Sequence, residues 1–126
     1  MRGLWLAAAA VACMVMSSSA WAEDDPLRAA ARAQQVFLLV EFNSSTCPAC
    51  DEMRPVVEKV LAGRPDLRFK EIDADLEVEL SKNYEVKCVP VYVVIDPEGE
   101  VRFSDVGMRT AEELDDILEQ AGVGGR

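Results

Sequence analysis

Two cysteines separated by two residues are the side chains of this sequence best suited to chemistry. The run Cys47-Pro48-Ala49-Cys50 follows a polar stretch and opens a helix-like pattern. In the first turn of a helix, unpaired backbone N–H groups and the helix dipole favour negative charge, which would stabilise a Cys47 thiolate. Pro48 suits the first helical turn because it has no N–H to leave unpaired. The pair predicts thiol–disulfide exchange, with Cys47 attacking a client and Cys50, one turn deeper, resolving the mixed disulfide.

Other readings of the pair are a structural disulfide, half of a zinc site, or a soft-metal site. Zinc prefers four nitrogen or sulfur ligands. The chain has no histidine, and of its four cysteines one, Cys13, lies in the apolar N-terminal stretch, which leaves three for the domain. We therefore expect no metal and no cofactor beyond the redox-active disulfide itself. Two cysteines can hold Cu(I), so a non-catalytic copper or thiol carrier stays open as an alternative.

Hydrophobic periodicity predicts the elements that must position the pair. The apolar run at 36–42 predicts a buried strand, and residues 43–46 a polar loop. From Cys47 onward, apolar residues recur at three- and four-residue steps, which predicts a helix that contains Pro55 and ends near Gly63. The other predicted elements are a helix at 27–35, a strand at 67–72, a helix at 76–84, a strand at 89–95, a strand at 100–106 and a helix at 110–121.

The beginning of the chain has the layout of a secretory signal peptide. Arg2 precedes an apolar stretch at 3–16, and the small-x-small triplet Ala20-Trp21-Ala22 follows. We therefore predict a signal peptide at 1–22, a single domain at 23–126 and a periplasmic location. The alternatives are an uncleaved leader that anchors the protein in a membrane, and a lipid on Cys13.

The charge of the chain argues against nucleic acid as a partner. The formal net charge is −10, and an acidic surface repels phosphate backbones. The acidic runs at 73–75 and 112–116 are interpreted as solvated surfaces that aid solubility.

Five features together resemble the thioredoxin family. The Cys47–Cys50 motif follows a strand, Glu41 lies six residues before it where the family has a buried acid, and Pro55 lies eight residues after Cys47, where the family's active-site helix contains proline. Val89-Pro90 matches the family's cis-proline, and Gly107 its glycine after the last strand. The resemblance implies an α/β thioredoxin fold, with a central mixed sheet of about four strands flanked by about four helices.

The resemblance also implies roles for single residues. Glu41 would accept the proton of Cys50, and Val89 and Pro90 would bind the backbone of a substrate. Cys88, which animal thioredoxins also have, is either a buried thiol or an exposed one that could pair with a substrate or with a second molecule. Protein thiols and disulfides would be the substrates, and a membrane thiol reductase the electron donor.

The motif does not fix the direction of electron flow, so we base a hypothesis for it on the charges near the pair. Asp51 and Glu52 disfavour a nearby thiolate, Arg54 offsets part of this, and Ala49 contributes no charge. A less acidic Cys47 favours a reductase of protein disulfides. A small oxidase or isomerase is the opposite hypothesis.

Overall fold

The computed structural model describes residues 25–124. The elements, in chain order, are α2 (Pro26–Gln34), β1 (Leu38–Asn43), α3 (Pro48–Ala62), β2 (Arg68–Asp73), α4 (Val78–Asn83), β3 (Val91–Ile95), β4 (Val101–Val106) and α5 (Ala111–Gln120). This confirms the predicted number and order of elements. The predicted signal peptide, Cys13 and the last two residues lie outside the described range. No helix within that range is long and apolar enough to cross a membrane.

The four strands form one mixed sheet in the order β2-β1-β3-β4. Strand β1 runs parallel to β2 and antiparallel to β3, and β4 pairs antiparallel with β3. The register aligns Glu41 of β1 with Glu71 of β2 and with Tyr92 of β3. It also aligns Phe42 with Val91, so the C-terminal end of β1 and the N-terminal end of β3 lie next to each other.

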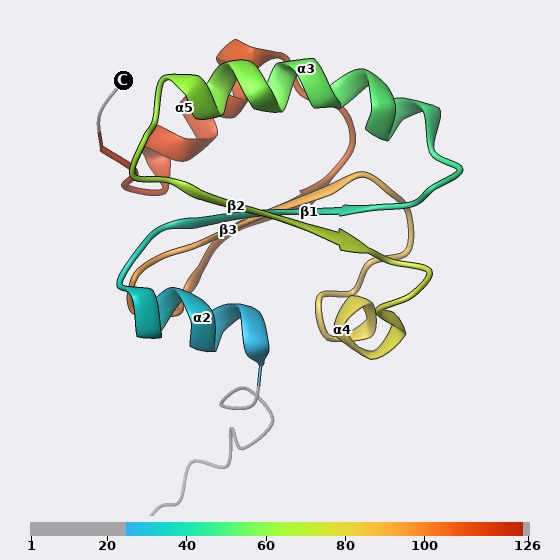
Figure 1. Ribbon diagram of the computed structural model, residues 1–126, viewed down its shortest axis with the longest axis horizontal. Helices are drawn as coiled ribbons and strands as arrows, with labels where there is room; N and C mark the ends of the chain where they lie inside the picture. The colour runs from blue at the N-terminus through green and yellow to red at the C-terminus, as the bar shows by residue number, and fades with distance from the viewer. Residues whose placement is uncertain (1–24, 125–126) are drawn as a thin grey trace, which may run out of the picture.

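Helices cover both faces of the sheet. Helices α3 and α5 lie on one face, and α2 and α4 lie on the other (Figure 1). Because successive strand residues point to opposite faces, the inner strands β1 and β3 contribute to two separate hydrophobic cores. On the α3 and α5 side, the core includes Leu39, Met53 and Leu118. The other core includes Val40 and Ala31.

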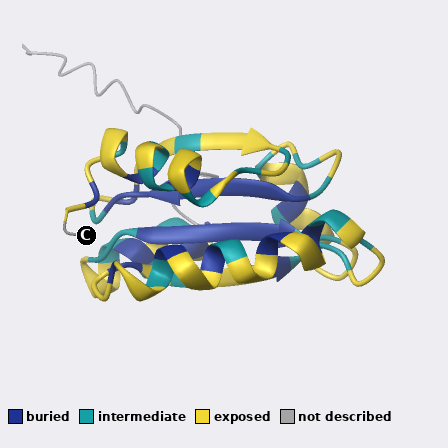
Figure 2. Cartoon of the chain, turned by 90° about the horizontal axis from the view of Figure 1, so that it is seen from above, coloured by how far each residue is buried: buried dark blue, intermediate teal, exposed yellow. Residues whose placement is uncertain are grey.

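The two inner strands are far more buried than the outer strands. Every residue of β3 is buried, and β1 is buried except for Asn43, whereas β4 is mostly exposed (Figure 2). This explains why the sequence around β1 and β3 is almost continuously apolar, as expected for strands with both faces covered. Strand β4 has the mixed pattern of an edge strand.

Several observed boundaries differ from the predicted ones by one or two residues, and local hydrogen bonds explain two of these differences. Strand β1 begins at Leu38 because the Val36 N–H donates to the Ala31 carbonyl at 3.2 Å and so belongs to the end of α2. Helix α4 begins at Val78 because the Asp73 carboxylate accepts from the Asp75 N–H at 2.9 Å and forms a turn there. At the last helix, Thr110 is the N-cap residue, and its Oγ1 accepts from the Glu113 N–H at 3.1 Å.

A buried arginine joins the end of α3 to α5. Arg64 is 2% exposed, and its Nε lies 3.1 Å from Asp115 Oδ1. Its remaining nitrogens reach Glu119 Oε1 and the carbonyls of Asp115 and Val123. Asp115 therefore departs from the prediction that residues 112–116 form a solvated surface, because it binds a charge that is inaccessible to water.

Candidate active site

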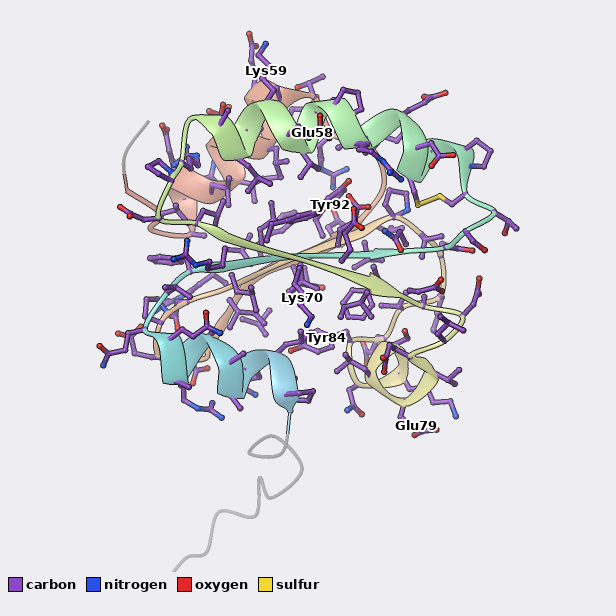
Figure 3. All side chains as sticks on the ribbon, in the orientation of Figure 1. Glu58, Lys59, Lys70, Glu79, Tyr84 and Tyr92 are labelled. Carbon is purple, nitrogen blue, oxygen red and sulfur yellow. A yellow bond between two sulfur atoms is a disulfide. The ribbon has the colours of Figure 1, made fainter. Side chains whose placement is uncertain are left out.

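The two cysteines of the predicted motif are joined in a disulfide at the beginning of α3 (Figure 3). Cys47 is the N-cap residue of the helix, with extended backbone angles, and its Sγ accepts from the Cys50 N–H at 3.0 Å. Cys47 is half-buried, whereas Cys50 is 4% exposed. The predicted difference in depth between the cysteines is therefore present, and it leaves Cys47 as the sulfur that a client can reach.

The loop before Cys47 is held by the neighbouring loop after β2. Ser44 Oγ donates to Asp75 Oδ2 at 2.6 Å, and the Ala74 N–H donates to the Asn43 carbonyl at 2.8 Å. The Ser44 carbonyl in turn accepts from the Cys47 N–H at 3.3 Å. These hydrogen bonds hold both ends of the loop that leads to the disulfide. Next to them, Leu76 is 80% exposed and offers an apolar side chain to solvent.

The charged residues in the first turns of α3 are exposed. Asp51 and Glu52 lie on the surface, and the Arg54 Nη2 contacts Asp51 Oδ1 at 3.5 Å. The charge of Arg54 is therefore partly neutralised by Asp51, one of the two acids that follow the motif. Such an exposed pair contributes little to stability, and its effect on a nearby thiolate is screened by salt.

The Val89-Pro90 peptide bond is cis, as the resemblance implied. The Pro90 carbonyl accepts from the Gly107 N–H at 2.8 Å, which attaches the loop before β3 to the loop after β4. Gly107 has a φ of +111°, a conformation that glycine adopts without strain. Pro90 precedes Val91, whose strand partner is Phe42. The proline therefore lies near the C-terminal end of β1, where the loop that leads to Cys47 begins.

Arg109 fastens the loop that contacts Pro90, a role that the sequence did not reveal. Its Nη2 lies 2.7 Å from Asp105 Oδ2, and its Nη1 donates to the Met108 carbonyl at 3.0 Å. The Arg109 N–H points to Met53 Sδ at 3.4 Å, and Met53 is a buried residue of α3 one turn after Cys50. Met108, which is exposed, directly follows Gly107 and so belongs to the loop that contacts Pro90.

Cys88 is exposed and is the free cysteine of the described residues. It lines a cavity of about 310 Å³ together with Tyr84, Val91 and Val106, among others. Of the two readings left open, the buried thiol is therefore wrong and the exposed thiol is correct.

Glu41 is buried, at 3% exposed, on the face of the sheet that α3 covers. Burial raises the pKa of its carboxyl group above the ordinary value, and hydrogen bonds from Tyr92 and Asn43 partly offset that rise. Glu71 raises the pKa further by charge repulsion, and Arg54 lowers it. The carboxyl group borders a cavity of about 450 Å³ between α3 and β2, which is also lined by Arg54, Glu58 and Glu71. A carboxyl group in this setting can take up and release a proton.

The hydrogen-bond partner of Glu41 is Tyr92, a residue of β3 that the sequence analysis did not single out. Tyr92 Oη donates to Glu41 Oε2 at 2.6 Å. Tyr92 stands in an apolar strand, and its only distinguishing signal was a hydroxyl group in a run of aliphatic residues. A buried tyrosine hydroxyl needs a partner, but only the strand register identifies Glu41 as that partner.

The described residues contain no group of three or more His, Cys, Asp or Glu side chains arranged to hold a metal ion. The site consists of a dithiol or disulfide pair, a buried carboxyl group and a loop with a cis-proline.

Solved structures first define the fold of this domain. Thioredoxin NaTrxh from Nicotiana alata superposes with a TM-score of 0.67 at 22% identity, covering 83% of this chain and 87% of that one. Oxidised mitochondrial thioredoxin 3 from Saccharomyces cerevisiae gives a TM-score of 0.65 at 25% identity, covering 73% and 84%. The domain therefore has the thioredoxin fold.

Sequence comparison then gives the family. The family model Thioredoxin matches residues 21–120. Putative thioredoxin 2 from Streptomyces coelicolor is 28% identical over 85 residues, which are 68% of this chain and 63% of that protein. Thioredoxin from Mycoplasmoides gallisepticum is 27% identical over 82 residues, 65% of this chain and 81% of that protein. The chain belongs to the thioredoxin family, and its domain is a thioredoxin-like thiol–disulfide oxidoreductase with Cys47 and Cys50 as the redox pair.

Proposed function

We propose that this protein is an exported reductase of protein disulfides that works in the periplasm. The charge around the half-buried Cys47 supports reduction as the direction of the reaction. Two exposed acids, Asp51 and Glu52, follow it in α3, and Arg54 is paired with Asp51. Negative charge disfavours the Cys47 thiolate, which makes the reduced form less stable and the dithiol a better electron donor.

The reaction proceeds in two exchanges. The Cys47 thiolate attacks one sulfur of a client disulfide, so that the client's other sulfur leaves as a thiolate and takes a proton from solvent. Cys50 then loses its proton to the Glu41 carboxylate and attacks the Cys47 sulfur. The second client sulfur leaves as a thiolate, the client is reduced by two electrons, and the Cys47–Cys50 disulfide is formed.

Substrate and donor follow from the same chemistry. Val89 and Pro90 would align a client's backbone beside Cys47, with Leu76 and Met108 as exposed apolar contacts. The oxidised protein needs two electrons to start again, and a membrane thiol reductase would supply them in an exported setting. The leader at 1–22 supports export, and mass measurement of the N-terminus of the secreted protein tests whether cleavage follows Ala22.

An oxidase or isomerase is the second candidate, and one contact favours it. The Cys50 N–H directed at Cys47 Sγ would stabilise a thiolate there, as would the helix N-terminus. A stabilised thiolate makes the disulfide a stronger oxidant.

The reduction potential of the Cys47–Cys50 pair decides between the two. It is measured in dithiol and glutathione buffers with thiol-trapping mass shifts. A value at or below about −230 mV supports the reductase, and a value above about −180 mV supports the oxidase or isomerase. If no disulfide between these cysteines formed at any poise, the redox proposal would fail, and the metal or thiol carrier would take its place.

Catalysis itself is tested with two matched cysteine variants. Cys47→Ser should abolish dithiothreitol-driven reduction of insulin, whereas Cys88→Ser should retain it, because Cys88 is outside the disulfide. Equal activity in both variants and the parent protein would contradict a catalytic role for the pair.

A further inference from the structure

The two tyrosines of this chain each donate a hydrogen bond to a buried carboxylate. Tyr92 donates to Glu41 on the α3 side of the sheet, and Tyr84 donates to Asp25 on the α2 and α4 side. Figure 3 shows the two tyrosines on opposite sides of the sheet. Only the first pair shares a face with the helix that carries Cys50.

The hydrogen bond from Tyr92 is the shorter and more buried of the two that the Glu41 carboxyl group accepts. The oxygen–oxygen distance is 2.6 Å, and Tyr92 is 1% exposed. The other oxygen, Oε1, accepts from Asn43 Nδ2 at 3.3 Å, a weaker contact. The two oxygens are therefore held unequally, with Oε2 fixed and Oε1 more loosely bound.

The remaining charges that face Glu41 come from two elements. On β2, Glu71 is its register partner, and on α3, Arg54 and Glu58 line the same cavity. Glu71 and Arg54 are exposed and act through partly hydrated space, and their effects on the pKa of Glu41 are opposite. The hydrogen bond from Tyr92 is thus the contact least screened by water.

We propose that Tyr92 is a positioning residue for proton transfer: it holds Glu41 Oε2 through its hydroxyl group, stabilises the ionised carboxylate, and leaves Oε1 to take the proton of Cys50. This inference rests on the proposed function, in which Glu41 is the proton acceptor. Burial, together with the hydrogen bond to Glu41, raises the pKa of Tyr92 itself, so its hydroxyl remains a donor throughout the neutral range.

Tyr92→Phe removes the hydroxyl group and keeps the ring. Without its strongest donor, the ionised carboxylate is less stable, and the pKa of Glu41 should rise by about one unit, as expected for loss of a hydrogen bond to a charged group. The pKa is read from the side-chain carboxyl ¹³C resonance of the oxidised protein, assigned with Glu41→Gln. The acid limb of the kcat/KM profile for insulin reduction should move to higher pH by the same amount.

Tyr84→Phe is the matched control. It deletes an equivalent hydroxyl from an equivalent carboxylate on the far side of the sheet. It should lower the melting temperature, as Tyr92→Phe does, but leave the Glu41 resonance and the acid limb in place. In a Glu41→Gln background, Tyr92→Phe should not move the acid limb further.

The readouts separate this inference from the proposed function. If the pKa of Glu41 does not change in Tyr92→Phe, or changes equally in Tyr84→Phe, the role of Tyr92 is refuted. If the pKa rises but the acid limb stays, Tyr92 does govern Glu41, and it is the assignment of Glu41 as proton acceptor that fails.

A second experiment tests the proposal without Tyr92→Phe, in case that variant does not fold. Incorporating 3-fluorotyrosine makes both phenols more acidic and therefore stronger donors. The pKa of Glu41 should then fall relative to the unlabelled protein, and fluorine resonances of the two tyrosines can be assigned with Tyr84→Phe. An unchanged Glu41 pKa in this protein would overturn the proposal.

Discussion

Burial and hydrogen bonding act in opposite directions on the carboxyl group of Glu41. Burial has the larger effect, and the pKa of Glu41 in the folded protein lies above its ordinary value. Over the pH range between the unfolded and folded pKa values, the native state keeps a proton that the unfolded state has released. Stability therefore falls as pH rises through this range, and the loss is complete above the folded pKa.

Glu41→Gln should remove this loss, because glutamine is neutral at every pH. We expect the variant to be more stable than the parent at pH 8 and similar to it at pH 4, with urea unfolding followed at several pH values. Glu79→Gln, at an exposed position on α4, is the control and should leave the difference between pH 4 and pH 8 unchanged. A parent protein whose stability at pH 8 exceeds that of Glu41→Gln would contradict the argument.

At the residue scale, the sequence predicted the participants but not their partners. Spacing within one segment indicated the Cys47–Cys50 pair, and the resemblance to a known family implied the burial of Glu41 and the cis-proline. The Tyr92 hydroxyl bond could not be predicted in this way, since it depends on the register between β1 and β3. A shift of one residue would turn Tyr92 to the opposite face of the sheet.

Between elements, a single buried guanidinium joins α3 to α5. Arg64→Ala removes its ion pair with Asp115, its packing, and its hydrogen bonds to the backbone carbonyls of Asp115 and Val123. We expect a loss of about 2–4 kcal/mol in the free energy of unfolding. Arg68→Ala, at an exposed arginine of β2, should change it by about 0.5 kcal/mol or less. Chemical denaturation of both variants checks the difference, and equal effects would refute the assigned role of Arg64.

We expect the loop between β4 and α5 to affect the binding of protein clients more than the reduction of small disulfides. Arg109→Met loses the contacts to Asp105 and to the Met108 carbonyl, so the loop beside Pro90 is held less firmly. KM for insulin should rise several-fold, while the rate with a small aromatic disulfide and the reduction potential stay unchanged. Arg102→Met, which breaks an ion pair of β4 with Asp96, is the control. A changed potential in Arg109→Met would show that the loop acts on the cysteines themselves.

Helix caps and periodicity were visible in the sequence, whereas contacts between elements were not. The N-cap residue Thr110 and the spacing of the apolar residues Leu114, Ile117 and Leu118 indicate α5 almost to the residue, because capping and amphipathic spacing are local. Arg64 followed α3 without any local sign that it would be buried. Its burial results from the way α5 packs over the end of α3, an arrangement that sequence spacing does not specify.

Across the whole molecule, the sheet separates the chemistry from half of the core. Met53 and Tyr92 belong to the cluster with α3 and α5, and Glu41 is buried on the same face, whereas Ala31 and Val40 belong to the cluster on the other face. The paired apolar strands β1 and β3 predicted a layered α/β fold. The order of the strands, β2-β1-β3-β4, was not predicted, because strand order is a property of the assembled chain.

The exposure of Cys88 leads us to propose a covalent dimer under oxidising conditions. Within the described residues Cys88 has no disulfide partner, and Cys47 and Cys50 are bonded to each other. We expect diamide to produce a species of twice the mass on non-reducing gels, which disappears with dithiothreitol and in Cys88→Ser. A dimer that persists in Cys88→Ser would assign the contact to another surface.

The described C-terminal end of the domain lies at the opposite end of the long axis from the beginning of α3, where the disulfide is (Figure 1). A peptide or handle appended to the C-terminus would therefore be attached at the far end from the reactive sulfurs. Immobilised through such a handle on an electrode or a sensor chip, the protein would present Cys47 to the solution. The same orientation makes it a candidate for a surface-bound reductant or for a bait that captures clients as mixed disulfides in its Cys50→Ser form.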